Sequence, residues 1–161
     1  MERRVAWLGI GLIAAGAILI AGSAAFARPG SILWGFGGPN LGSGPDPGSP
    51  GFVPGTTSAP RIVRIVASAD LRFYPDTVAV KQGETIRFEV TSMGPITHEF
   101  MVGPAADVAA DTPRTPEVAD ITMMQTKSLT YTFTGSGPFA YACHAPGHYE
   151  AGMRGTIVIA P

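Results

Sequence analysis

The chain has 161 residues, which suggests one domain with additional segments. Its formal net charge is −1, and from Arg61 onward the charged residues are mixed in sign and form no basic stripe. We therefore expect no nucleic-acid partner. The single cysteine excludes an internal disulfide, so an exported form of this chain needs another use for its thiol.

The N-terminal segment, residues 1–27, pairs a short basic start at Arg3 and Arg4 with a long apolar run. Two interpretations remain open. A signal peptide cleaved after Ala27 fits the small residues at Ala25 and Ala27. An uncleaved membrane anchor fits the 23 residues from Val5 to Ala27, since a span needs about 20. Both predict a periplasmic or otherwise extracytoplasmic protein, secreted or anchored to the cytoplasmic membrane, because the basic end stays inside.

Residues 28–60 are predicted to be a flexible linker. Glycine and proline dominate the segment, most densely between Gly42 and Gly51. Such a composition buries too little apolar surface to offset the entropy lost on ordering.

Residues 61–161 have the pattern of an all-β domain. Runs of β-branched and alternating residues predict short strands. They are Arg61–Val66, Thr77–Val80, Thr85–Val90, His98–Val102, Ser128–Phe133, Phe139–Cys143 and Gly155–Ile159. We predict a turn at Phe73–Asp76, and a long connection over residues 103–126 with room for one short helix. Several short strands at regular spacing favour a β-sandwich, and about 100 residues suffice for its core.

A thiol, an imidazole and a thioether recur at five-residue steps, at Cys143, His148 and Met153. A lone cysteine is often only a small buried apolar residue. Here histidine and methionine follow it in a loop that contains Pro146 and Gly147. Structural zinc sites and iron–sulfur clusters need more cysteines than this chain has. One cysteine, two histidines and a weak methionine are instead the ligands of a blue-copper site.

The second histidine of such a set lies far upstream, at His98. The chain has three histidines in all, and the third, His144, directly follows Cys143. Consecutive side chains of a strand point to opposite faces, so we expect His144 to point away from the metal.

The segment Tyr141–Gly155 resembles the C-terminal copper loop of the cupredoxin family, the type 1 blue copper proteins. Its C-x4-H-x4-M spacing is nearest to rusticyanin-like and sulfocyanin-like members. It is also similar to periplasmic copper-tolerance cupredoxins, which share a His-Glu-Phe segment and a Pro-Gly-His-aromatic-Glu-Ala-Gly-Met loop. The resemblance extends to Pro75–Val78 and Lys81–Glu84, and it covers residues 61–160.

This resemblance implies a Greek-key β-sandwich that holds one type 1 copper ion. It implies His98, Cys143 and His148 as equatorial ligands and Met153 as the axial ligand.

The function expected from these residues is electron transfer outside the cytoplasmic membrane, with one copper ion cycling between Cu(I) and Cu(II). The alternative is a periplasmic copper-binding protein for copper tolerance or delivery. We see no Ser-His-Asp order, paired catalytic carboxylates or phosphate loop, so we expect no enzyme activity. The expected partners are redox proteins, with membrane contact through the N-terminal segment, and the expected state is a monomer.

Overall fold

The computed structural model describes residues 46–161. The predicted signal peptide or anchor, residues 1–27, and the linker up to residue 45 lie outside the described residues. Within residues 46–161, no helix has the length and apolar character needed to cross a membrane.

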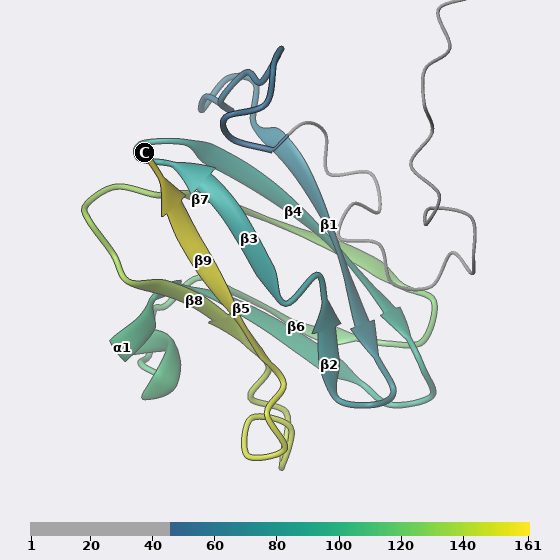
Figure 1. The fold of residues 1–161 in the computed structure, drawn as a ribbon. Helices are drawn as coiled ribbons and strands as arrows, with labels where there is room; N and C mark the ends of the chain where they lie inside the picture. Colours follow the sequence, from purple (N-terminus) through teal and green to yellow (C-terminus); the bar gives the residue numbers. More distant parts are fainter. Residues whose placement is uncertain (1–45) are drawn as a thin grey trace, which may run out of the picture. The chain divides into compact units, whose positions relative to one another are not determined.

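Two β-sheets face each other and form a sandwich (Figure 1). The first sheet has the order β2 (Arg72–Tyr74), β1 (Arg61–Ser68), β4 (Thr85–Met93) and β7 (Thr126–Thr132). The second has the order β3 (Thr77–Lys81), β9 (Arg154–Ala160), β8 (Phe139–Ala142), β5 (His98–Pro104) and β6 (Glu117–Ile121). The pairs β1–β4 and β3–β9 are parallel, and the other pairs are antiparallel. The predicted all-β sandwich is confirmed.

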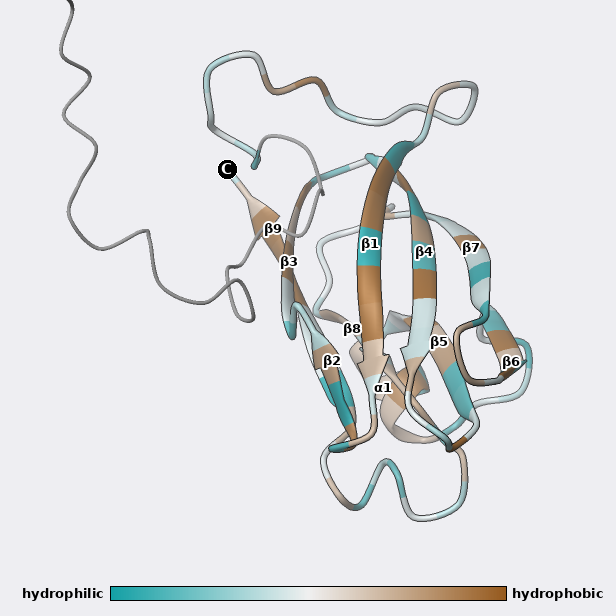
Figure 2. Ribbon diagram, turned by 90° about the vertical axis from the view of Figure 1, so that its right-hand side faces the viewer, coloured by the Kyte–Doolittle hydropathy of each residue, from teal (hydrophilic) through white to brown (hydrophobic). Residues whose placement is uncertain are grey.

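Alternation of buried and exposed residues explains why these segments form facing sheets. Along β1, the side chains of Val63, Ile65 and Ala67 are buried while their neighbours are more exposed, and Figure 2 shows hydrophobic and hydrophilic bands along this strand. Aromatic rings from both sheets meet in the core: Phe88 lies 5.1 Å and Tyr141 lies 5.4 Å from the ring centre of Phe100. Such aromatic pairs contribute about 0.5–1.5 kcal/mol each beyond the area that they bury.

Two strands were not expected from the sequence. The predicted turn at Phe73–Asp76 is wrong at its start, because β2 pairs with β1 and buries Phe73 completely. The long connection over 103–126 contains the one short helix, α1 (Ala105–Ala109), but also β6. Strand β6 gave no signal because it buries only its last residue fully, and a bulge interrupts its pairing with β5.

Residues 46–60 form turns but no helix or strand. This last part of the predicted linker is nevertheless bonded to the sandwich. The Gly55 N–H donates to a Glu84 carboxylate oxygen at 3.1 Å, and the Gly55 carbonyl accepts from the Thr85 N–H at 2.9 Å.

Candidate metal centre

Three of the predicted ligands converge at one end of the sandwich. His98 begins β5, Cys143 follows the last residue of β8, and His148 lies in the loop between β8 and β9. One ligand atom from each residue lies within 4.8 Å of the other two. The Cys143 Sγ is 3.3 Å from Nδ1 of His148, and the centres of the two imidazole rings are 5.2 Å apart.

The ligand loop folds through hydrogen bonds between the backbones of the predicted ligands. The Cys143 N–H donates to the Met153 carbonyl at 3.1 Å, and the Met153 N–H donates to the His148 carbonyl at 2.9 Å. The His148 N–H in turn donates to the Ala145 carbonyl at 2.9 Å. Gly147 has a φ of 81°, a conformation that glycine adopts at no steric cost. These backbone bonds link the three predicted ligands within one loop.

His98 is the observation that points most directly to a metal. Its side chain is fully buried, yet neither Nδ1 nor Nε2 has a hydrogen-bond partner within residues 46–161. Buried polar atoms are nearly always bonded, so an unbonded imidazole beside a thiol calls for a further ligand. Burial lowers the pKa of His98, and the nearby His148 lowers it further. The ring is therefore held in the neutral form that a metal ion requires.

Cys143 is buried, and its sulfur accepts a hydrogen bond from the Glu99 N–H at 3.2 Å. Burial raises the pKa of the thiol, although hydrogen bonds from the Glu99 and Ala145 backbones oppose this shift. The metal-free protein therefore holds Cys143 as a neutral thiol, and metal binding must release its proton. The Glu99 amide was not anticipated, because a backbone donor carries no signal in the side-chain sequence.

Met153 is fully buried in the same hydrophobic cluster as Cys143. Its backbone is bonded to both Cys143 and His148, so the residue belongs to the ligand loop. The role of its sulfur as the axial ligand stays a prediction.

His144 lies outside the ligand cluster. Its Nε2 donates to the Val108 carbonyl, at the end of α1, at 2.8 Å. Its ring stacks on Tyr149, with centres 4.7 Å apart and an interplanar angle of 14°. The expectation that His144 points away from the metal ligands is confirmed.

Comparison with known proteins identifies the family to which this site belongs. Residues 61–160 match the family model described as copper binding proteins of the plastocyanin/azurin family. The chain belongs to this family. The matched range includes all four predicted ligands of this cupredoxin, and the donor set of one cysteine and two histidines fits a single copper ion.

Relatives of this cupredoxin include two proteins named copper-resistant cuproprotein CopI. The one from Rubrivivax gelatinosus is 36% identical over 111 residues, which cover 63% of this chain and 67% of the relative. The one from Pseudomonas aeruginosa is 28% identical over 142 residues, covering 64% of this chain and 78% of the relative. Among solved structures, auracyanin A, a blue copper protein from Chloroflexus aurantiacus, has a TM-score of 0.53 at 20% identity, covering 63% of this chain and all of that one. This last likeness concerns the fold alone.

Proposed function

We propose that this cupredoxin is a type 1 copper electron-transfer protein that acts outside the cytoplasmic membrane. The observation that carries the proposal is the buried cluster of His98, Cys143 and His148, with both nitrogens of His98 unbonded. Thiolate and imidazole together are the equatorial ligands of blue-copper electron-transfer sites.

Copper, when bound, would supply a one-electron couple between the cuprous and cupric states. The protein's part is to hold the ligands in one geometry. His98 is fixed at the start of a paired strand, and Cys143 and His148 are fixed by the backbone bonds of their loop. The side chains of Phe100 and Tyr141 are fully buried in the same core cluster as Cys143, so the thiol lies in an apolar part of the core without access to solvent. His148 is only half-buried, so it is the ligand of the three that reaches the surface.

The same residues argue against substrate turnover. A second catalytic copper would need several more histidines, and the only remaining one, His144, bonds to Val108 instead. We therefore propose a monomeric carrier that exchanges electrons with redox proteins. Its N-terminal segment directs it across the cytoplasmic membrane or anchors it to the outer side of that membrane.

The first experiment is a visible absorption spectrum of the full chain after addition of cupric ion. We expect an intense thiolate-to-copper band that disappears in Cys143→Ser, since serine keeps the size of the side chain but removes the sulfur. His144→Gln is the matched control and should keep the band, because His144 lies outside the ligand cluster. A wild-type chain without the band, or a Cys143→Ser chain that retains it, would refute the proposal.

Copper tolerance or delivery is the second candidate, because the relatives at 36% and 28% identity are named copper-resistant cuproproteins. Voltammetry of the copper-loaded chain separates the two functions. Fast, reversible electron exchange at an electrode supports the carrier. Tight copper uptake with slow or irreversible electron exchange supports copper tolerance. That result would refute the electron-transfer proposal but not the assignment of the copper ligands.

A further inference from the structure

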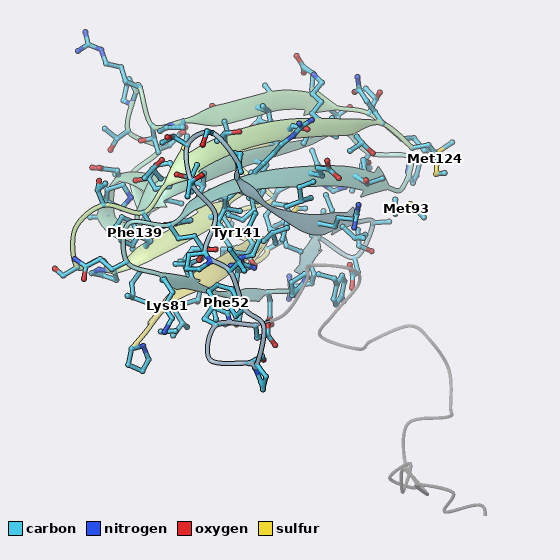
Figure 3. All side chains as sticks on the ribbon, turned by 90° about the horizontal axis from the view of Figure 1, so that it is seen from above. Phe52, Lys81, Met93, Met124, Phe139 and Tyr141 are labelled. Atoms are coloured by element: carbon cyan, nitrogen blue, oxygen red, sulfur yellow. The ribbon has the colours of Figure 1, made fainter. Side chains whose placement is uncertain are left out.

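Three methionines are exposed at one end of the sandwich. The exposed fraction is 49% for Met93, 62% for Met123 and 66% for Met124. We call these three residues the thioether cluster. Figure 3 shows Met93 and Met124 side by side at the end of the molecule away from Lys81 and Phe52. Large apolar side chains are usually buried, so three exposed ones in one place need an explanation.

Backbone hydrogen bonds at the end of β4 place two of these residues next to each other. In the antiparallel pair of β4 and β7, Thr91 is opposite Thr126, and their hydroxyl oxygens are 2.7 Å apart on the exposed face. The Ser92 N–H donates to the Gln125 carbonyl at 3.0 Å and the Met124 N–H donates to the Ser92 carbonyl at 2.9 Å, so Met124 and Gln125 both lie opposite Ser92, as in a β-bulge. Met93 follows Ser92 in β4, and the Met124 backbone is bonded to Ser92, so the two methionines lie next to each other at this end of the sheet. Both side chains are exposed, and methionine is unbranched and flexible, so the two sulfurs can turn toward one ion.

The third thioether comes from a tight turn. Met123 and Met124 are the central residues of Thr122–Gln125, closed by the Gln125 N–H to the Thr122 carbonyl at 2.9 Å. The Gln125 side chain also accepts from the Thr122 N–H at 3.1 Å, which fixes the turn. Met124 has a φ of 61°, a left-handed conformation that turns normally give to glycine or asparagine. A methionine at such a position is costly for the fold and suggests that the side chain has a use.

We propose that the thioether cluster is a second metal site, specific for the cuprous ion. All three donors are uncharged sulfur atoms, and soft thioethers select Cu(I) over cupric or zinc ions. The turn directly follows β6, whose Ile121 pairs with His98, so this exposed site lies at the same end as a ligand of the buried centre. The proposal does not depend on electron transfer, because it concerns different residues from the Cys143 centre.

The test is an NMR titration of the full chain with isotope-labelled methionine methyl groups. The chain is titrated anaerobically with Cu(I) and, separately, with Ag(I), a redox-inert ion that also prefers sulfur ligands. The first equivalent fills the buried centre. We expect the second equivalent to shift the methyl signals of Met93, Met123 and Met124 together and to leave buried Met101 unchanged. If these three signals stay still, or if the second equivalent shifts only other groups, the ion is adventitious and the proposal is wrong.

Two variants complete the test. The triple variant Met93→Leu, Met123→Leu, Met124→Leu keeps an apolar surface but removes the sulfurs, and it should bind about one equivalent of Cu(I) fewer. Met124→Gly relieves the left-handed conformation, so it should be at least as stable as the wild type and still lose affinity for the second ion. Both should keep the thiolate-to-copper band, which separates failure of this site from failure of the Cys143 centre. Unchanged uptake of Cu(I) by the triple variant would overturn the proposal.

Discussion

The metal centre depends, at the scale of single residues, on polar groups that are left for an ion to satisfy. The imidazole of His98 is fully buried without a hydrogen bond from the described residues, and the buried thiol of Cys143 accepts from the Glu99 N–H at 3.2 Å. An isolated buried imidazole is a cost to the metal-free fold. The centre is thus arranged for binding at the expense of stability, which gives the metal-free protein a dependence on pH.

His98 should make the metal-free protein less stable in mild acid. Burial and the neighbouring His148 lower the pKa of His98 in the folded state, whereas in the unfolded chain it lies near its ordinary value of 6.5. Between these two values the unfolded state binds more protons, so the free energy of unfolding rises with pH there and is lost as pH falls below about 6.5. Urea unfolding at about pH 7.5 and about pH 5.5 measures this loss. His98→Asn should reduce the difference, and His144→Gln should not; an equal difference in all three chains would contradict the assignment.

Only part of the centre was readable from the sequence. Cys143, His148 and Met153 were found together because their spacing is local, within one loop. His98 comes from a strand far upstream, and chemistry alone gives no distance between it and the loop; the family resemblance supplied it. The hydrogen bond from the Glu99 N–H to the Cys143 sulfur could not be predicted, because every residue except proline has a backbone N–H and only the fold decides which one meets the thiol.

At the scale of strands, the chain contains an ion pair that joins separate elements. Glu84, in the turn between β3 and β4, is fully buried and contacts Arg61 Nε of β1 at 2.6 Å. Its oxygens also accept from the N–H groups of Gly55 and Lys81, at 3.1 and 2.8 Å. One carboxylate therefore holds β1, β3 and the segment before the domain.

Glu84→Ala should lower the free energy of unfolding by about 3–5 kcal/mol, because it leaves the charge of Arg61 without its buried partner. Glu89→Ala is the matched control, since Glu89 pairs with Arg64 and Arg87 on the exposed side of the sheet. Exposed pairs contribute about 1 kcal/mol or less. Urea unfolding of both variants compares the two carboxylates. Equal losses in the free energy of unfolding would show that the buried pair stabilises the fold no more than the exposed pairs do.

The strands themselves could be predicted where burial alternates and not elsewhere. Strand β4 alternates over most of its length and was found with its first residue correct. Strand β2 is three residues long, too short for a period to show, and β6 is mostly exposed and bulged. Both are held by pairing with neighbouring strands, which is a property of the assembled sheet rather than of the segment.

At the scale of the whole molecule, the core of the sandwich is built from apolar residues of both sheets and not from the metal. The buried cluster includes side chains from β1, β4, β5, β8 and β9, with aromatic rings in contact across the layers. Small zinc domains differ, because their fold depends on the metal. We therefore expect this protein to fold without copper, and we expect the bound ion to add stability without being required for folding.

Removal of copper should leave a cooperatively folded protein with a lower melting temperature. A ligand that binds only the folded state stabilises it by about 2.7 kcal/mol at a free concentration one hundred times its Kd. The melting temperature should therefore rise with added copper in the wild type and stay nearly constant in Cys143→Ser, which lacks the thiolate ligand. Calorimetry of the copper-free and copper-loaded full chain makes the comparison, with far-ultraviolet circular dichroism to follow the β-structure. Loss of the β-signal at room temperature on copper removal would mean that the metal, and not the apolar core, holds the two sheets together.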